Sequence, residues 1–241
     1  MYLENLVIDA VDPRRLGRFW EAAVGGETLT DEPNNYETRL TVDGGPVLDL
    51  CFQPVAELPT TTPQLHVDLE GGARQDEVVA RLLELGARHL DIGQGDVPWV
   101  VLADPEGNAL CVMEDRAAYA DTGPIAALPL DSADPERDAA FWSWLTGWTD
   151  VTDGGLRSLR HPSSRGLLLE FCPERTPKGP AKNRFHLDVR LETGDDADAV
   201  ATAIADHGGR ELHLGWGDLP WRHYADPSGN EFCVLPVRLD E

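Results

Sequence analysis

Residues 98–113 read PWVVLADPEGNALCVM, and residues 220–235 read PWRHYADPSGNEFCVL. In both stretches an Asp and a Pro lead through one polar residue to a Gly. This order is typical of a tight turn, because Pro fixes φ at the first corner and Gly accepts the left-handed conformation. Apolar runs flank each turn, so both stretches predict a β-hairpin.

The two hairpins belong to a longer repeat. Asp104 and Asp226 are 122 positions apart, and Trp20 and Trp142 have the same spacing. The spacing is 120 for the strand motif that begins with His66 in the first half and His186 in the second. A period this long indicates a tandem duplication into two domains, because solenoid repeats span only about 20–50 residues.

The repeat divides the 241 residues into a first domain at 1–115 and a second at 124–241, joined by the linker 115–124. The chain carries 20 Lys and Arg against 43 Asp and Glu, a net charge of −23. Such an excess of negative charge argues against nucleic acid or an anionic membrane as the partner.

The N-terminal residues MYLENLVIDAVDP lack the basic region of a signal peptide, and no apolar run approaches about 18 residues. We therefore expect a cytoplasmic protein. The cysteines have no CxxC spacing and fall at similar places in the two halves: Cys51, Cys111, Cys172 and Cys233. A disulfide within each half stays open, but a reducing compartment favours free thiols.

Each half contains two units of one strand, one helix and about three strands. In the first unit Asp12 caps a helix that has Pro13 in its first turn and ends at Gly25. The aromatic side chains of this helix lie on one stripe and are expected in the core. The apolar pattern of Gln75–Leu85 predicts the helix of the second unit, and Gly86 ends it. The fold class is therefore α+β, with four βαβββ units.

Three features resemble those of the vicinal oxygen chelate superfamily. They are the helix that follows DP and carries FW, the strands HVDL and HLDV, and the PW strand before DPxGNxxC. This group contains glyoxalases, bleomycin-resistance proteins and ring-cleaving dioxygenases, and the chain is most similar to the glyoxalase-like domains. The resemblance covers nearly the whole chain. It implies two tandem domains with curved mixed sheets around a ligand pocket. Whether the units pair within a half or across halves stays open.

Metal-dependent members of the superfamily place one ligand on each of four strands, usually His or Gln first and Glu last. The resemblance puts these positions at Asn5, Asp49, His66 and Cys111 in the first half, and at Ala127, Glu170, His186 and Cys233 in the second. Ala127 cannot ligate, and thiols suit soft metals. We therefore expect no catalytic metal and no cofactor, with a divalent ion in the first domain as the open alternative.

His66 and His186 are the expected catalytic residues, each acting as a general base. Asp68 and Asp188 follow by two positions and share the sheet face of the histidines. The full set expected to bind substrate is Asp49, Asp68, Trp99, Cys111, Glu170, Asp188, Trp221 and Cys233. Plain structural roles are the alternative: histidines hydrogen-bonded within the sheet, cysteines as small buried hydrophobes, and tryptophans in the core.

Two functions remain open. The first is a glyoxalase-like isomerase or lyase that acts on a small oxygenated metabolite without the full metal-ligand set. The second is a non-catalytic protein that binds a small molecule or antibiotic, as bleomycin-resistance proteins do, and the acidic charge would suit a cationic ligand. A ring-cleaving dioxygenase ranks third, because Ala127 and Cys233 break its ligand pattern. A small molecule is the expected partner, without nucleic acid or membrane, and a homodimer stays open.

Overall fold

The computed structural model describes residues 1–59, 63–152, 155–214 and 219–238, and it contains four strand–helix–strand units. Unit 1 consists of β1 (Tyr2–Ala10), α1 (Pro13–Val24), β2 (Glu27–Glu32), β3 (Asn35–Thr41) and β4 (Val47–Pro54). Unit 2 consists of β5 (Val67–Gly72), α2 (Gln75–Leu85), β6 (Arg88–His89), β7 (Val100–Ala103) and β8 (Ala109–Glu114). The short helix η1 (Ala117–Tyr119) lies in the linker between the halves.

The second half repeats this order. Unit 3 consists of β9 (Ile125–Ser132), α3 (Pro135–Thr146), β10 (Thr149–Asp150), β11 (Arg157–Arg160) and β12 (Leu168–Pro173). Unit 4 consists of β13 (Phe185–Arg190), α4 (Ala197–Asp206), β14 (Arg210–Leu212), β15 (Arg222–Ala225) and β16 (Glu231–Leu235). The α+β class and the four βαβββ units are confirmed.

The predicted helix boundaries follow from capping. Asp12 accepts a hydrogen bond from the Arg15 backbone N–H at 3.0 Å, and α1 ends at Gly25, whose φ is 69°. In α3 the cap is Asp134 and the end is Gly147, with φ at 71°. The sequence missed only strands without an apolar pattern. β2 is one of them, because it is almost fully exposed and has no buried face to create a periodicity.

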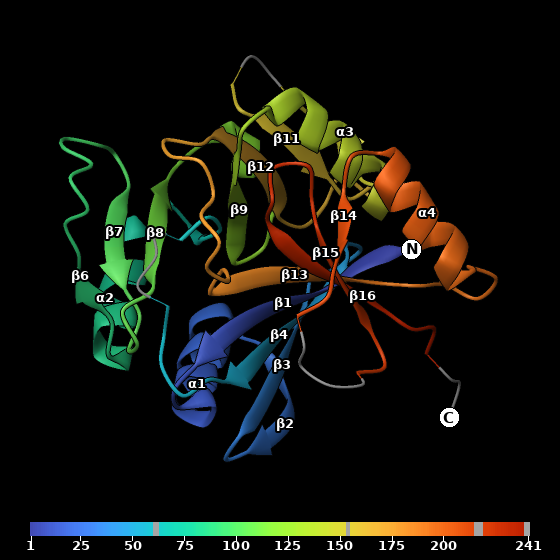
Figure 1. Cartoon of the computed structure of the whole chain (residues 1–241). Coiled ribbons are helices and arrows are strands. Elements are labelled where there is room, and N and C mark those ends of the chain that lie inside the picture. Colours follow the sequence, from blue (N-terminus) through green and yellow to red (C-terminus); the bar gives the residue numbers. More distant parts are fainter. Residues whose placement is uncertain (60–62, 153–154, 215–218, 239–241) are drawn as a thin grey trace.

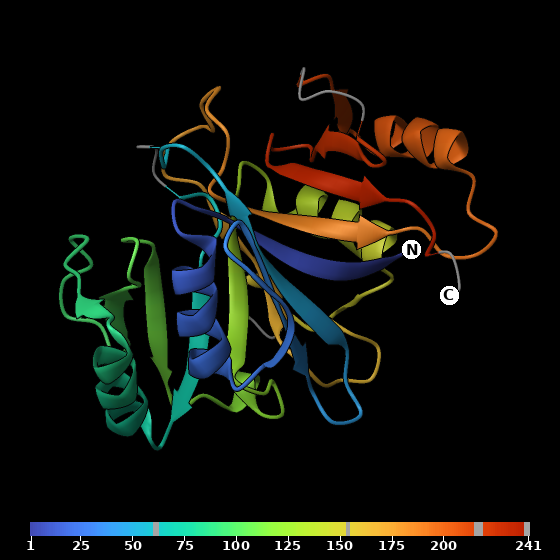
Figure 2. The ribbon, with the colours of Figure 1, turned by 90° about the horizontal axis from the view of Figure 1, so that it is seen from below.

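The units pair across the two halves. The sheet that we call sheet A has the order β14-β15-β16-β13-β1-β4-β3-β2, and sheet B has the order β10-β11-β12-β9-β5-β8-β7-β6. Unit 1 therefore pairs with unit 4, and unit 2 pairs with unit 3. The blue strand β1 lies beside the orange strand β13 in Figure 1, and Figure 2 shows the red strand β16 as the next neighbour.

Each sheet presents one face to the helices and one face away from them, which we call the inner face. Leu6, Val67, Leu69 and Leu187 join the main core with helix residues such as Trp20. Because side chains alternate along a strand, their neighbours in the sequence point to the inner face. The histidine and aspartate of each predicted pair therefore lie on the inner face.

The aspartate of each repeated hairpin links two units. Its Oδ1 accepts hydrogen bonds within the turn, which in Asp104 come from the backbone N–H groups of Glu106 and Asn108 at 2.9 Å. Its Oδ2 accepts a bond from the helix of the other unit in the same half, from Trp20 Nε1 to Asp104 and from Trp142 Nε1 to Asp226, both at 3.1 Å. All four side chains are buried, so these bonds hold each half together inside the core.

No helix in the described part of the chain is long and apolar enough to cross a membrane.

A double-mutant cycle tests the tryptophan–aspartate link. Trp20→Phe and Asp104→Asn should each lower the free energy of unfolding, measured by urea denaturation, because a buried partner loses a charge-assisted hydrogen bond worth about 1.5–3 kcal/mol. The pair should show a coupling energy of about 1 kcal/mol or more. The control combines Trp20→Phe with Asp226→Asn, whose effects should add. Additive effects in both pairs would contradict the link.

Candidate functional site

The predicted ligand positions are brought together by sheet and not by half. Sheet B joins His66 and Cys111 of the first half to Ala127 and Glu170 of the second. Sheet A joins Asn5 and Asp49 to His186 and Cys233. The grouping by half is therefore wrong, and the reason is topological. β1 pairs with β13, and β5 pairs with β9, so each inner face is built from both halves.

Two rows of side chains cross each inner face. The first row in sheet A reads Cys233, Asp188, Asn5 and Asp49, and the same row in sheet B reads Cys111, Asp68, Ala127 and Leu168. The second row in sheet A has Val7 paired with His186 and Cys51, and in sheet B it has Pro129 between His66 and Glu170. The strand pairings alone therefore define two comparable sites.

This register corrects the alignment of Asp49 with Glu170. Asp49 pairs with Asn5 in the first row, whereas Glu170 pairs with Pro129 in the second row. The position equivalent to Glu170 is Cys51, at an offset of 119, because the second half has fewer residues between the end of its helix and this position. A shift of two residues keeps the side chain on the same face, so Glu170 still points inward, on the row of His66.

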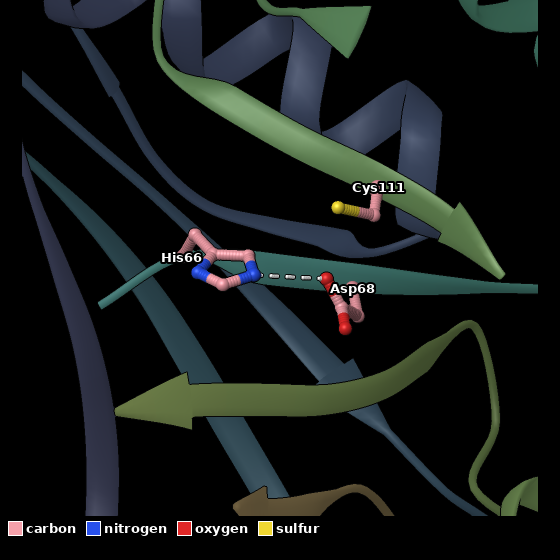
Figure 3. Close-up of side chains that lie close together, drawn as sticks. All are labelled: His66, Asp68 and Cys111. Carbon is pink, nitrogen blue, oxygen red and sulfur yellow. Dashed lines mark ion pairs between the residues drawn. The ribbon is translucent and has the colours of Figure 1, made fainter. Parts of the chain in front are cut away.

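In sheet B the imidazole of His66 meets the carboxylate of Asp68. His66 Nε2 lies 3.3 Å from Asp68 Oδ1, as the dashed line in Figure 3 shows, and the donor atoms of Cys111 and these two residues lie within 4.8 Å of one another. The His66 side chain is 33% exposed, whereas that of Asp68 is 7% exposed. Of the two residues, His66 is therefore the one in contact with solvent.

Glu170 is a carboxyl group held in its neutral form up to neutral pH. Burial raises its pKa to about 7, and the nearby charge of Asp68 adds to the shift. The charge of Arg116 and the hydroxyl of Tyr119 oppose the rise in its pKa. A carboxyl group whose pKa is near the working pH is well suited to transfer protons.

The pKa of His66 is also raised, but here burial opposes the rise instead of causing it. Burial by itself would lower its pKa, but the contact with Asp68 and the charges of Asp131 and Glu170 outweigh this effect and raise it. The surrounding carboxylates therefore favour the cationic form of the imidazole. Sheet B thus places an imidazole with a raised pKa and a titrating carboxyl group on one row.

An apolar cluster separate from the main core surrounds these polar groups. It contains Val101, Cys111, Met113, Tyr119, Ala126, Ala127 and Leu168, with Trp99 packed against it. The guanidinium of Arg116 lies 5.6 Å from the centre of the Trp99 ring and 5.5 Å from that of Tyr119. Trp99 thus packs against this cluster, and its role in binding a substrate stays a prediction.

Arg116 and Tyr119 were not predicted from the sequence. Both come from the linker that was treated only as a connection, and η1 places them against the inner face of sheet B. The repeat contained part of the signal, since Arg116 and Arg238 are 122 positions apart. Arg238 likewise reaches the inner face of sheet A, where it pairs with Glu4.

In sheet A the corresponding site is closed. His186 Nε2 lies 3.5 Å from Asp188 Oδ1, with both side chains at most 7% exposed, and Asn5 Nδ2 donates to Asp188 Oδ2 at 3.1 Å. Burial lowers the pKa of His186 to about 3, with the charges of Lys182 and His223 adding to it. Burial also raises the pKa of Asp188 to about 7.

Asp49 and Trp221, two residues expected to bind substrate, have other partners. Arg39 donates from Nε and Nη2 to the two oxygens of Asp49, both at 2.7 Å. This two-point ion pair leaves Asp49 little capacity for a ligand. Trp221 Nε1 donates to His223 Nε2 at 3.2 Å. Their roles in binding substrate stay predictions that these contacts do not favour.

The four thiols are free. Cys111 and Cys233 are buried, and burial is the main cause that raises the pKa of both thiols well above its usual range. A thiol that stays protonated at neutral pH is a poor nucleophile. Covalent catalysis by either cysteine is therefore not supported.

The residues do not fit the hard divalent ion of the metal-dependent relatives. At the first position sheet B has Ala127, which has no donor atom, and sheet A has Asn5, which is bonded to Asp188. At the last position both sheets have a thiol, and Asp49 is neutralised by Arg39. Mg²⁺ and Mn²⁺ prefer oxygen ligands, so neither inner face supplies a suitable set.

Surface hollows formed by the described residues lie away from both rows. One is bordered by α2 residues such as Val78 and by the linker around Tyr119. Another lies beside the N-terminal turn of α1, with Arg15 and Pro105, and a third lies near Lys178 and Arg210. Tyr119 is the site residue that connects the inner face of sheet B to one of these hollows.

A family model for the glyoxalase-like domain matches this chain twice, over residues 5–113 and 127–235. The chain is similar to glyoxalase I from Zea mays, with a TM-score of 0.68 and 17% identity over 98% of this chain and 92% of that chain. It is also similar to a candidate dioxygenase from Bacillus subtilis subsp. subtilis str. 168, with a TM-score of 0.61 and 16% identity over 98% of this chain and 85% of that chain. At these identities the two likenesses show the fold alone. No curated protein matches the chain.

The pKa of Glu170 predicts a pH-dependent stability. The folded state keeps this proton up to a pH of about 7, whereas the unfolded chain loses it near 4.5, so the free energy of unfolding falls as the pH rises through this window. Glu170→Gln removes this cost, which is at most about 3 kcal/mol. The variant should therefore gain thermal stability over the wild type at pH 8 and less at pH 5.

The matched control is Glu57→Gln, because Glu57 is exposed. Its melting temperature should follow the wild type at both pH values. A Glu170→Gln variant whose difference from the wild type is the same at pH 5 and pH 8 would contradict the raised pKa.

Proposed function

We propose that this chain, which belongs to the family of glyoxalase-like domain proteins, acts on a small oxygenated metabolite at the inner face of sheet B. The reaction is a proton transfer of the isomerase or lyase type. The observation that carries the proposal is the shared row of Glu170 and His66, on which a carboxyl group with a pKa of about 7 accompanies an imidazole whose pKa is raised by the neighbouring carboxylates.

Sheet B is favoured over sheet A because its first row is smaller and less polar. Asn5 fills sheet A beside Asp188, and Ala127 replaces it beside Asp68. Leu168 stands where sheet A has Asp49 and its arginine partner. The replacement by Ala127 removes the side chain that would otherwise occupy the space beside Asp68.

The row geometry suits two groups that act on one small molecule. Neighbouring strands are about 4.8 Å apart, so the backbones of His66 and Glu170 lie about 10 Å apart across Pro129. Their side chains then stand on either side of Pro129 on the inner face. A carbonyl compound bound over Pro129 would have its oxygen near the imidazole and its adjacent carbon near the carboxylate.

In the proposed step the Glu170 carboxylate removes the proton from the carbon next to the carbonyl group. The electron pair of the broken C–H bond forms the C=C bond of an enolate, and the negative charge moves to the oxygen. His66 donates a hydrogen bond to this oxygen, and Asp68 orients the imidazole and favours its cationic form. In an α-hydroxy carbonyl compound, the hydroxyl proton then moves to the enolate oxygen, and return of the carbon-bound proton to the former carbonyl carbon completes an isomerisation. In a lyase reaction the enolate instead re-forms the carbonyl group and expels a leaving group from the β-carbon, which departs with its bonding electron pair.

The residues around His66 and Glu170 indicate which kind of ligand would fit. Trp99 and Tyr119 supply flat apolar surface, and Arg116 lies against both rings. Approach is proposed from the side of His66, Trp99 and Arg116, which are partly exposed. A small, partly apolar molecule with a carbonyl or hydroxyl group therefore suits the site.

A non-catalytic binding protein is the second candidate. The observation that favours it is the arginine stacked on two aromatic rings, an arrangement that also holds planar ligands without any chemistry. The two functions differ in one measurable respect: only the enzyme exchanges a carbon-bound proton.

Deuterium exchange tests the enzyme directly. In D2O at pH 7, the wild type should exchange the proton next to the carbonyl group of at least one compound in a panel of small α-hydroxy carbonyl compounds, such as dihydroxyacetone and acetoin, as followed by proton NMR. Glu170→Gln should slow this exchange about 100-fold or more, because general acid–base groups contribute about 10²–10⁴. Glu57→Gln is the control and should match the wild type.

The panel also separates the two candidates. A compound that raises the melting temperature of the wild type without any exchange, and loses this effect in Trp99→Ala, would replace the enzyme by the binding protein. Exchange that is unchanged in Glu170→Gln would remove Glu170 from the mechanism.

A further inference from the structure

The guanidinium of Arg116 is held beside the inner face of sheet B with donors to spare. Its Nε donates to Glu114, and its Nη1 donates to the Tyr119 hydroxyl at 3.4 Å. Its Nη2 has no acceptor among the described residues, and 37% of the side chain is exposed. The rings of Trp99 and Tyr119 lie 5.6 and 5.5 Å away. The guanidinium is thus positioned by its neighbours and can still bind another group.

Arg238 is the equivalent residue of sheet A, and there the same nitrogen binds carboxylates. Arg238 Nη2 lies 2.7 Å from Glu4 Oε1 and 3.9 Å from Asp49 Oδ2. The side chains of Glu4 and Asp49 are only 5% and 7% exposed. The repeat itself therefore shows what an arginine at this position binds, namely a carboxylate at the inner face.

Sheet B lacks both of these carboxylates. Ala126 is the equivalent of Glu4, because each is the residue at which the register shifts in the central antiparallel strand pair of its sheet. Leu168 has the first-row position that Asp49 has in sheet A. Both replacements belong to the apolar cluster of sheet B. Sheet B has therefore kept the arginine and lost the two acidic side chains that it would bind.

A second arginine follows the same pattern. Arg39 pairs in register with Asp49 and binds its carboxylate at 2.7 Å. Arg160 pairs in register with Leu168, and it donates to the backbone carbonyl groups of Gly166 and Ala120 instead. Two arginine positions of the sheet A network are thus kept in sheet B, and the matching acidic positions are apolar.

We infer that Arg116 binds a carboxylate of the ligand, so that the substrate class of sheet B is a small carbonyl acid, such as a 2-oxo acid. The inference rests on the proposed function and narrows it. The carboxylate of the ligand takes the place that Glu4 and Asp49 have at Arg238. A guanidinium suits this group because its parallel N–H donors match two carboxylate oxygens. The carbonyl group of the ligand then lies toward His66 and Glu170.

The acidic groups of sheet B allow one further negative charge. Asp68 lies 3.3 Å from His66, and Glu114 is paired with Arg116 through Nε alone. Glu170 keeps its proton up to a pH of about 7. The net charge of the whole chain matters less, because exposed charges more than about 10 Å away are largely screened by salt. These groups therefore add little repulsion against a carboxylate at Arg116.

Matched pairs of compounds test the inference. Each pair consists of a 2-oxo acid and the ketone in which a hydroxymethyl group replaces the carboxylate, such as pyruvate with hydroxyacetone and hydroxypyruvate with dihydroxyacetone. Deuterium exchange in D2O at pH 7, corrected for the uncatalysed rate, gives kcat and KM for each compound. The wild type should prefer at least one acid over its ketone about 10-fold or more in kcat/KM, chiefly through KM, because the charged contact is present before the reaction.

Variants at the two equivalent arginines locate the preference. Arg116→Gln should raise KM for the preferred acid about 10-fold or more and change KM for the matched ketone less than about threefold. Arg116→Lys keeps the positive charge without the paired donors, so it should restore part of the preference. Arg238→Gln is the matched control in sheet A and should keep the preference of the wild type. Calorimetric titration measures binding of the same compounds where no exchange occurs.

Three results would overturn the inference: a wild type that prefers no acid in exchange or in binding, a preference that Arg116→Gln keeps, or one that Arg238→Gln loses. If Arg116→Gln does not fold, as judged by circular dichroism, the wild type and Arg116→Lys decide. Binding of the acid should then weaken with added salt in both proteins, and binding of the ketone should not.

The inference and the proposed function fail separately. Binding of an acid that depends on Arg116, without any exchange, would count against the reaction and leave the carboxylate site in place. Exchange that Glu170→Gln abolishes and Arg116→Gln leaves unchanged for every acid would support the reaction and count against the carboxylate site.

Discussion

The architecture depends on one buried hydrogen bond that occurs twice, from a helix tryptophan to a hairpin aspartate. Asp104 forms its own turn with one oxygen and holds Trp20 with the other. Asp226 does the same for Trp142. These bonds join the two units within a half, whereas the strand pairs join units across halves. No single unit can therefore move away without breaking both kinds of contact.

This interlocking explains what could be predicted from the sequence. The DPxGN turn, the Asp12 cap and the alternation around His66 are local signals, and each produced the expected element in the structure. The pairing of units is not local. Unit 1 would bury the same kind of apolar face whether it paired with unit 4 or with unit 2. Composition and periodicity therefore do not distinguish pairing across the halves from pairing within a half. The site was consequently assembled from the right strands but grouped in the wrong sets.

The remaining gaps in the site have equally physical causes. Glu170 was placed two residues from its true position because the second half has fewer residues between its helix and β12, which shifts the strand relative to the repeat without changing the face. Arg116 and Tyr119 come from a linker that has no periodic pattern, and their position depends on how the chain returns over the sheet. Register and loop path are tertiary properties, so a single sequence indicates them only weakly.

The two inner faces differ in the residues at a few equivalent positions of their rows. Asn5 and Asp49 give sheet A a polar first row that is closed by Arg39, whereas Ala127 and Leu168 leave sheet B apolar. On the second row, Glu170 of sheet B occupies the position that Cys51 has in sheet A, so a carboxyl group lies on the same row as the histidine. The duplication thus supplied two copies of one framework, and because the Trp–Asp bonds and the main core maintain that framework, the inner faces were free to diverge. The tightly bonded polar groups of sheet A favour rigidity, and the carboxyl group of sheet B, which titrates near neutral pH beside small apolar side chains, favours chemistry.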